Sequence, residues 1–265
     1  MKLAIGQLEP QVGDVEENLI RTRKILDEAE RACAEVLVLP ELCNSGYVFK
    51  DKEEAFYSSE PIPEGLMCRE LRSWSAKDRL VVAGICEKTE EGLYNSAVAF
   101  SNGEYMATYR KIHLFMNEQD WFRPGMVEPP VLKFKDSRFG IMICFDWAFP
   151  EIARMLALKQ AQVILHPSNL VLRYCQDAMI TRSIENRVFT ATANRVGEER
   201  NITFSGASQI TDPRGNRLFQ MSSQEVGVRM IDIDPTNADD KAITERNDLL
   251  RDRRPDLYKL LIQSD

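Results

Sequence analysis

The feature that most constrains the fold of this chain is a regular alternation of short apolar segments with amphipathic ones. Residues 36–39 read Val-Leu-Val-Leu, which is typical of a strand buried on both faces. Over residues 14–33 the apolar positions recur at spacings of four and three, which places them on one face of a helix that Asp14 can cap. That face comprises Val15, Leu19, Thr22, Leu26, Ala29 and Cys33. The same patterns predict strands over 2–8, 80–86, 93–100, 104–110, 138–144, 163–166, 189–194, 205–211 and 217–232, and helices over about 64–78, 148–159 and 175–188.

The order of these segments predicts an α/β fold in which helices cover the sheets. Asn102-Gly103 separates two predicted strands and indicates a hairpin, because both residues readily adopt positive φ angles. Two architectures fit: a single three-layer sheet, or two sheets packed face to face with helices outside. The second fits the large number of strands better. Since no repeat or Gly/Ser linker interrupts the sequence, we expect residues 1–265 to form a single domain, with about 235–265 as a C-terminal extension.

The charge balance and hydropathy of the chain limit its partners. The chain has 34 basic and 41 acidic residues, a formal net charge of −7, and no basic run. Such a chain repels a phosphate backbone, which argues against nucleic acid as a partner. No segment reaches the roughly 18 uninterrupted apolar residues of a membrane helix. The opening MKLAIGQLEP lacks the longer apolar region of a signal peptide, so we expect a cytoplasmic protein without membrane contact.

The number and spacing of the cysteines and histidines limit which metal sites and catalytic groups the chain can form. The six cysteines form no CxxC pair, and in a reducing compartment we expect free thiols. Only two histidines are present, His113 and His166, so a zinc site would need widely spaced cysteines or carboxylates. We therefore expect neither a metal nor another cofactor. The scarcity of histidine also argues against Ser-His-Asp or Cys-His catalysis.

Three of the predicted strands end in a reactive side chain, namely Glu41, Lys111 and Cys144. In layered α/β folds ligands bind beyond the carboxyl ends of strands, so these groups can meet in one site. A thiol with an ordinary pKa of about 8.5 needs a base at neutral pH. Glu41 can serve as that base, and Lys111 can stabilise an oxyanion. Each residue taken alone is equally compatible with a structural role, as a core cysteine, a loop carboxylate or a surface lysine.

The amino-acid sequences around these three residues resemble those of a known family. LPELCNSGY (39–47), YRKIHLF (109–115) and ICFDWAFPE (143–151) resemble the three signature regions of the nitrilase, or carbon–nitrogen hydrolase, superfamily, in a short microbial amidase or nitrilase-type branch. The resemblance continues through HPSNL (166–170) and ENRVFTATANRVGEER (185–200), so it covers nearly the whole chain. It implies a four-layer αββα sandwich that assembles into homodimers or higher homo-oligomers.

The resemblance also implies roles for individual residues. Glu41 matches the general base, Lys111 the catalytic lysine and Cys144 the nucleophile. Glu118 resembles a second glutamate beside the lysine, although Asp120 competes for that position. The substrate-binding positions implied are the backbone N–H of Phe145, which would complete the oxyanion site, and the side chains of Tyr47 and Asn169. Trp147 is either a core residue or, because it is close to Cys144 in the sequence, part of the substrate-binding pocket.

Other polar residues near the motifs are expected to have structural roles. His113 and His166 should orient their segments through hydrogen bonds, and Asp146 should fix the turn after the nucleophile. We expect an ion pair between Glu185 and Arg187. Surface positions are expected for Arg173 and Arg195.

The sequence therefore predicts a thiol hydrolase that cleaves the non-peptide C–N bond of a small amide through a thioester on Cys144, releasing ammonia or a small amine. A nitrilase that converts a small aliphatic nitrile into acid and ammonia with the same three residues is the alternative, because both reactions pass through a thioester. A non-catalytic binding protein on the same fold is a third hypothesis, but such a protein should have lost one of the three residues.

Overall fold

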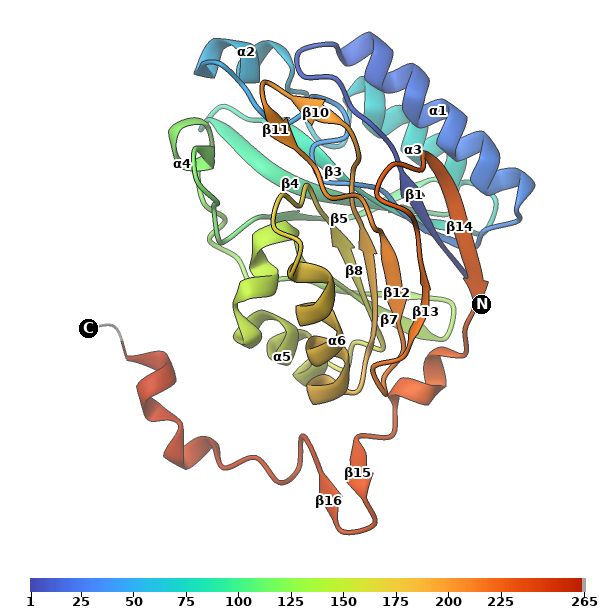
Figure 1. Ribbon diagram of the computed structural model, residues 1–265, viewed down its shortest axis with the longest axis vertical. Coiled ribbons are helices and arrows are strands. Elements are labelled where there is room, and N and C mark those ends of the chain that lie inside the picture. Colours follow the sequence, from blue (N-terminus) through green and yellow to red (C-terminus); the bar gives the residue numbers. More distant parts are fainter. Residues whose placement is uncertain (264–265) are drawn as a thin grey trace.

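The computed structural model describes residues 1–263, and its centre is formed by two six-stranded sheets packed face to face (Figure 1). The first sheet has the order β14 (Gly227–Asp232), β1 (Lys2–Gln7), β2 (Val36–Val38), β3 (Leu80–Lys88), β4 (Leu93–Ser101), β5 (Glu104–Arg110). The second has the order β13 (Arg217–Gln220), β12 (Gln209–Thr211), β9 (Phe189–Ala193), β8 (Val163–Pro167), β7 (Ser137–Ile141), β6 (Val131–Phe134).

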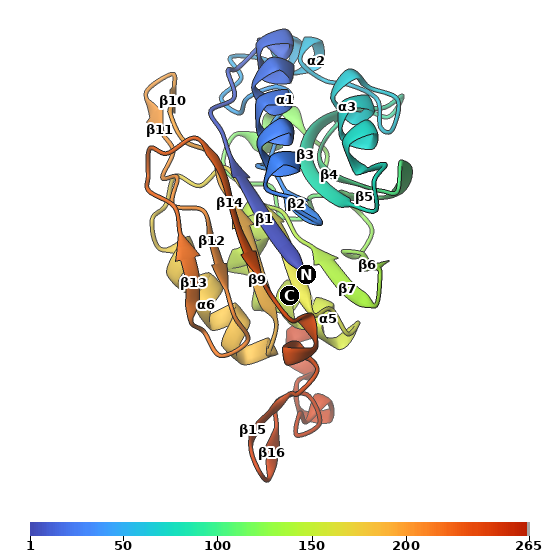
Figure 2. The same ribbon diagram turned by 90° about the vertical axis from the view of Figure 1, so that its right-hand side faces the viewer.

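Helices cover the outer face of each sheet. The helices α1 (Val15–Arg31) and α3 (Leu66–Ser75) lie on the first sheet, whereas α5 (Pro150–Leu158) and α6 (Cys175–Asn186) lie on the second (Figures 1 and 2). The layers therefore follow the order αββα. This arrangement confirms the predicted four-layer sandwich and rules out the three-layer alternative.

Side chains alternate between two cores along each inner strand. Val36 and Val38 of β2 pack between the two sheets, while Leu37 packs beneath α1 and α3. Both faces of these strands are covered, which explains why the sequence reads as an unbroken apolar run rather than as alternating polar and apolar residues. Burial of each such side chain contributes about 1.5–3 kcal/mol to folding.

The strand directions place several chain ends at one edge of the sandwich. In the first sheet β1, β2 and β3 are parallel, and β4 and β5 continue from β3 as an antiparallel meander. Consequently β5 runs in the same direction as β2. In the second sheet β7, β8 and β9 are parallel to one another. The segments that follow β2 and β5 therefore emerge at a common edge of the first sheet.

The structure confirms the predicted hairpin turn and the predicted start of the first helix. Asn102 and Gly103 have φ angles of 53° and 76°, as a two-residue hairpin requires. Asp14 caps α1 through a 3.0 Å hydrogen bond from the backbone N–H of Glu17. Cys33, however, is exposed and lies beyond the end of α1 with a φ of 58°, because the chain turns there to enter β2.

Three strand predictions are wrong in their bounds. The predicted strand 205–211 begins only at Gln209, as β12. The predicted strand 138–144 ends at Ile141, and Cys144 instead begins the short 3₁₀ helix η1 (Cys144–Ala148). The predicted strand 217–232 is divided into β13 and β14, which belong to opposite sheets. The sequence did not predict β6, α2 (Lys52–Tyr57), α4 (Glu118–Trp121), or the hairpin of β10 (Glu198–Glu199) and β11 (Ile202–Thr203).

The segment after β14 lies outside the two sheets, at the lower edge of the molecule in Figure 1. It contains η2 (Pro235–Ala238), the small hairpin of β15 (Ala242–Thr244) and β16 (Asn247–Asp248), and the 3₁₀ helices η3 (Pro255–Leu257) and η4 (Lys259–Ile262). Among residues 1–263, no helix combines the length and apolarity that crossing a membrane requires.

Gly84 of β3 allows an unusually close approach between this strand and the segment after β2. A Cβ at this position would lie 2.3 Å from Cα of Glu41 and 2.6 Å from the backbone nitrogen of Leu42. These are backbone atoms, which cannot rotate away. We therefore expect Gly84→Ala to lower the free energy of unfolding by about 1–3 kcal/mol, measured by urea denaturation.

Gly140→Ala in β7 is the matched control. A Cβ there would meet the side chain of Leu156, with the nearest atom at 2.9 Å, and that side chain can change rotamer. We expect a smaller loss of stability for Gly140→Ala. Equal losses in the two variants would contradict the proposed clash with the backbone of Glu41.

Candidate active site

Four of the residues singled out in the sequence come together at one edge of the sandwich. Glu41 lies in the segment after β2, Lys111 directly follows β5, and Glu118 begins α4. Lys111 Nζ lies 2.7 Å from Oε1 of Glu41 and 2.7 Å from Oε1 of Glu118. Cys144 comes from the second sheet, and Glu41, Lys111 and Glu118 all act electrostatically on its thiol. The two sheets thus contribute to a single site.

The two carboxyl oxygens of Glu41 have different environments. Oε1 accepts hydrogen bonds from Lys111 Nζ and, at 2.6 Å, from Nδ2 of Asn95. Oε2 is buried and has no hydrogen-bond partner within the part of the chain that the structure describes. The backbone around Glu41 is held to β3, because Gly84 N–H donates to the carbonyl of Pro40 (3.0 Å). One oxygen of this buried carboxylate is therefore engaged, and the other is available to take a proton.

Lys111 is completely buried, and its charge is maintained by its neighbours. Burial lowers the pKa of the Lys111 ammonium, but the carboxylates of Glu118 and Glu41 raise it by more, so the pKa lies above its ordinary value. The backbone is fixed on both sides: the N–H of Lys111 donates to the carbonyl of Asn95 (2.8 Å), and its carbonyl accepts from the N–H of Gly125 (2.8 Å). The site therefore holds a permanent, well-positioned positive charge.

Glu118 is the second acidic residue, after Glu41, that contacts Lys111. Its Oε1 also accepts a 2.7 Å hydrogen bond from the hydroxyl of Tyr47. Burial raises the pKa of Glu118, the neighbouring Glu41 adds to this effect, and Lys111 opposes it. Asp120 is exposed at the surface of α4. Of the two acidic residues considered for this position, the structure thus brings only Glu118 to the lysine.

Cys144 lies at the start of η1 with a φ of 38°, a conformation that is uncommon for a residue with a side chain. Two contacts maintain this turn: Nε2 of His166 lies 2.9 Å from the carbonyl oxygen of Cys144, and Asp146 Oδ2 accepts the N–H of Ile143 at 2.9 Å. Burial raises the pKa of the Cys144 thiol well above its usual range, Glu41 raises it further, and Lys111 opposes both. The resting thiol is therefore protonated and needs a base before it can react.

Asp146 fixes the turn through three contacts. Besides the N–H of Ile143, its carboxylate accepts the hydroxyl of Tyr109 (2.8 Å) and lies 2.8 Å from Nδ1 of His113. The His113 ring stacks on Phe149 with 3.6 Å between centroids. His113 and Asp146 thus have the structural contacts that the sequence suggested.

The thiol opens into a narrow hollow of about 10 Å³. Phe145, Trp147 and Asn169 line it, as expected, together with Phe115 and the segment 170–172, which the sequence did not single out. Both polar atoms of the Asn169 side chain are buried and have no partner among the described residues. Tyr47 is not part of this lining, and its hydroxyl is directed to Glu118 instead.

Two expectations about arginine are wrong. Arg195 is fully buried, because Nη1 pairs with Glu199 at 2.5 Å and Nη2 donates to the carbonyl of Pro10 at 2.6 Å. Arg187 donates to backbone carbonyls rather than to Glu185, whose carboxylate pairs with Arg182 at 3.0 Å. Arg173 is exposed, as predicted.

Asn95 is the member of the site that sequence reasoning missed. The signal was present, because an asparagine in the apolar run of β4 is unusual, but a single polar residue in a strand does not reveal its partner. No cluster of three histidine, cysteine or acidic side chains suited to a metal ion occurs in residues 1–263.

The buried His166, which contacts the carbonyl oxygen of Cys144, provides a test of how the turn at Cys144 is stabilised. Burial lowers the pKa of His166 to about 4 from an ordinary value of 6.5, so the ring stays neutral in the folded protein. The unfolded chain binds this proton as the pH falls below 6.5, whereas the folded protein binds it only near pH 4. Unfolding is therefore favoured progressively between these values. We expect acidification from pH 7 to pH 5 to remove about 2 kcal/mol of stability through this residue.

The measurement is urea denaturation of wild type and His166→Gln at both pH values. The variant should be less stable at pH 7 but should lose about 2 kcal/mol less than wild type on acidification. Identical pH dependence of the two proteins would show that His166 does not remain neutral in the fold.

The chain resembles known proteins over nearly its whole length. Residues 2–241 match the family model of carbon-nitrogen hydrolases. A nitrilase from Pyrococcus abyssi is 42% identical over 97% of this chain and 99% of that protein. An (R)-stereoselective amidase from Pseudomonas sp. is 32% identical over 96% of this chain and 92% of that protein. The crystal structure of an amidase from Nesterenkonia sp. matches with a TM-score of 0.82 at 26% identity, covering 98% of this chain and 96% of that one. The protein therefore belongs to the carbon–nitrogen hydrolase family of the nitrilase superfamily, a family of enzymes.

Proposed function

We propose that this enzyme hydrolyses small amides through a thioester on Cys144, with Glu41 as the general base and Lys111 as the oxyanion stabiliser. The observation that supports this assignment best is the arrangement of Glu41, whose Oε1 is held by Lys111 and Asn95 while Oε2 remains free beside a buried, protonated thiol. A carboxylate in this state is suited to accept the thiol proton.

In the first half of the reaction Oε2 of Glu41 takes the proton from Cys144, and the thiolate attacks the amide carbon. The developing oxyanion is stabilised by Lys111, which donates two of its three N–H groups to Glu41 and Glu118 and keeps the third for substrate. The N–H of Phe145 in the first turn of η1 would be the second donor. Protonated Glu41 then gives its proton to the leaving nitrogen, and ammonia or a small amine departs.

In the second half a water molecule donates a proton to Glu41 and adds to the thioester carbon. The tetrahedral intermediate collapses, the bond from carbon to sulfur breaks, and the proton returns from Glu41 to the sulfur of Cys144. The acid leaves and the resting thiol is restored. Glu118 would keep Lys111 in place during both halves, and Tyr47 would orient Glu118.

The hollow beside Cys144 suggests which substrates fit. Its side chains are apolar except for the amide of Asn169, so it favours a small, uncharged acyl group. The two free polar atoms of Asn169, a donor and an acceptor, can pair with the carbonyl and the nitrogen of a primary amide. A substrate with a charged group near the carbonyl would have to bury that charge without a partner.

Amides are favoured over nitriles by two comparisons. A variant of the Nesterenkonia amidase shows Michael addition of acrylamide at the active-site cysteine, and another variant has been determined in complex with butyramide. The Pyrococcus abyssi nitrilase, at 42% identity, supports the alternative of nitrile hydrolysis. In that reaction the thiolate adds to the C≡N carbon to form a thioimidate. Water then adds to the thioimidate carbon, and ammonia leaves to give the same thioester.

Ammonia release from a panel of small aliphatic amides and dinitriles tests both candidates. We expect measurable turnover of amides by wild type and none by Cys144→Ala, because no thioester can form. Cys144→Ser should also be severely impaired. Glu41→Gln should lower kcat by about 10²–10⁴-fold, the usual contribution of a general base.

Cys68→Ala is the matched control, because Cys68 is another buried thiol but belongs to α3. It should retain wild-type turnover. Turnover near the wild-type rate in either Cys144 variant would disprove the mechanism. A panel in which dinitriles are turned over and amides are not would replace the amidase assignment with the nitrilase alternative.

We further propose that the chain acts as a single domain in the cytoplasm, with about 235–265 as an extension. All six cysteines are free thiols, which suits a reducing compartment. Its described part, residues 235–263, contributes no strand to either of the two six-stranded sheets.

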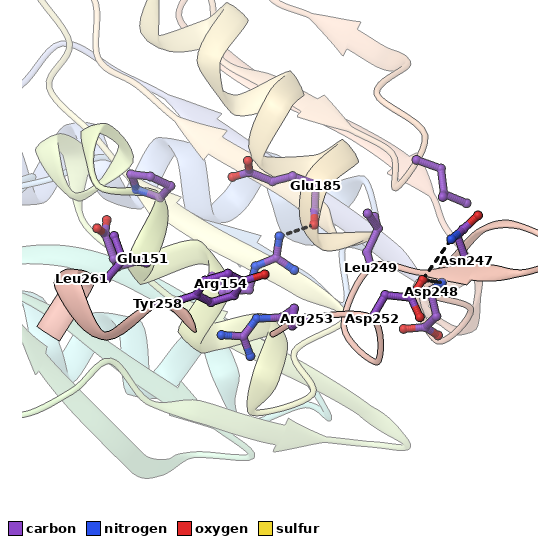
Figure 3. Close-up of a pocket in the computed structure, with 12 residues that line it drawn as sticks. Glu151, Arg154, Glu185, Asn247, Asp248, Leu249, Asp252, Arg253, Tyr258 and Leu261 are labelled. Atoms are coloured by element: carbon purple, nitrogen blue, oxygen red, sulfur yellow. Dashed lines mark hydrogen bonds between the residues drawn. The ribbon is translucent and has the colours of Figure 1, made fainter. Parts of the chain in front are cut away.

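We also propose that the protein forms a homodimer or a higher homo-oligomer. The end of the extension exposes four large apolar side chains, at 66–87% of their full area, namely Leu257, Leu260, Leu261 and Ile262. Beside them a cavity of about 450 Å³ lies between this segment and the outer helices, with Arg154, Glu185 and Tyr258 around it (Figure 3). Exposed apolar surface of this kind is typical of a surface that another chain covers.

Light scattering coupled to gel filtration measures the mass in solution. We expect wild type to have at least twice the mass of one chain, and Leu260→Asp combined with Leu261→Asp to shift it toward a single chain, since the new charges would be buried at the interface. Ile20→Asp, an exposed position on α1, is the control and should leave the mass unchanged. Wild type with the mass of one chain would contradict the proposal.

A further inference from the structure

Asn95 contacts two members of the catalytic cluster through different groups. Its side-chain Nδ2 donates to Oε1 of Glu41 at 2.6 Å, and its backbone carbonyl accepts the N–H of Lys111 at 2.8 Å. One residue of β4 therefore links the carboxylate that follows β2 to the lysine that follows β5.

The position of Asn95 in β4 explains how it reaches the site. Ala97 and Ala99 of the same strand pack in the core between the two sheets. Because side chains alternate along a strand, Asn95 lies on this same inner face, at the end of the sheet where Cys144 arrives from the other layer. It is 1% exposed, and its Oδ1 has no hydrogen-bond partner within residues 1–263. Burying an amide without satisfying both of its polar groups is costly, so a specific contact must retain it.

We propose that Asn95 is a positioning residue for the hydrolysis reaction: it holds Oε1 of Glu41 so that Oε2 alone faces the thiol and acts as the base. The inference rests on the proposed function, in which Glu41 removes the thiol proton. Lys111 alone would leave the carboxyl group free to rotate about its terminal bond, which would present either oxygen to the thiol. A second donor, approaching from β4, removes that freedom.

Asn95 differs from the other groups that act on Glu41 because its side chain does not titrate. Lys111 at the end of β5, Glu118 of α4, Cys144 of η1 and the hydroxyl of Tyr47 are all titratable and act on this cluster. Asn95 is the neutral donor. A hydrogen bond donated to a carboxylate stabilises its ionised form without adding a charge that would compete with Lys111.

The test compares Asn95→Leu and Asn95→Asp with wild type in the full-length enzyme, over a pH series with a turned-over amide. Both replacements approximate the shape of asparagine. Asn95→Leu removes the donor, and Asn95→Asp replaces the amide N–H with a carboxyl group that repels the Glu41 carboxylate when it is ionised. We expect kcat to fall about 10–100-fold with little change in KM, because Asn95 does not contact substrate. The acidic limb of the profile of kcat/KM against pH should move to higher pH in both variants. The shift should be larger for Asn95→Asp, which adds a carboxyl group beside Glu41.

Ser96→Ala is the matched control on the same strand. Ser96 donates a buried 2.6 Å hydrogen bond to Glu87, so this variant loses a comparable contact to a carboxylate outside the site. Its acidic limb should coincide with that of wild type. Circular dichroism and thermal melting identify any variant that fails to fold. If Asn95→Leu does not fold, Asn95→Asp, which is nearly isosteric with asparagine, still tests the inference.

The outcomes separate this inference from the proposed function. A uniform loss of rate at every pH, with an unmoved acidic limb, would reduce Asn95 to a structural residue and overturn the inference. Wild-type kinetics in both variants would do the same. If Glu41→Gln itself retains wild-type turnover, Glu41 is not the general base, and the proposed function is contradicted whatever Asn95 does. If Glu41→Gln lowers kcat to a rate that can still be measured and adding Asn95→Leu to it causes no further loss, the two residues act as one unit, as proposed.

Discussion

The rest of the site depends on one buried charge, the ammonium of Lys111 between two carboxylates. A buried cation without a partner would cost many kilocalories per mole, so the fold must supply counter-charges at hydrogen-bond distance. Glu41 and Glu118 each do so at 2.7 Å. Removal of either carboxylate would leave charge uncompensated in a dry interior. This requirement fixes the position of Glu41 relative to the segment 111–118, which lies far from it in the sequence, and it does so before any substrate arrives.

The packing of the two sheets then determines how Cys144 meets this cluster. The first sheet carries Glu41 and Lys111, whereas the second carries Cys144, whose turn is held by Asp146 and His166. Burial raises the pKa of the thiol, and Lys111 offsets part of that rise. Under the proposed mechanism the thiol therefore stays unreactive until it transfers its proton to Glu41. A buried, protonated cysteine is protected from non-specific oxidation, because oxidation requires an accessible thiolate.

The sequence predicted the layers and the meeting of Glu41, Lys111 and Cys144 at one edge because these features depend on local patterns. Apolar runs such as 36–39 identified buried strands, and strand ends identified Glu41 and Lys111. The sequence could not predict features that depend on distant contacts. The strand before Cys144 ends early because Asp146, itself held by Tyr109, captures the N–H of Ile143. Likewise, the sequence around Arg195 suggested a surface cation, because it does not reveal that the carbonyl of Pro10, which accepts a hydrogen bond from Nη2 of Arg195, lies beside it in the fold.

The single free oxygen of Glu41 constrains how a substrate can bind. In the proposed reaction the same atom accepts the thiol proton and later donates it to the leaving nitrogen, so that nitrogen must lie beside Oε2. The carbonyl oxygen must then point toward Lys111 and the N–H of Phe145, which leaves the acyl group facing the apolar hollow lined by Trp147. The same orientation serves a nitrile, whose nitrogen needs a proton as the thioimidate forms. The geometry of the base therefore fixes the orientation of the substrate, and the choice between amide and nitrile depends on the shape of the hollow rather than on the three catalytic residues.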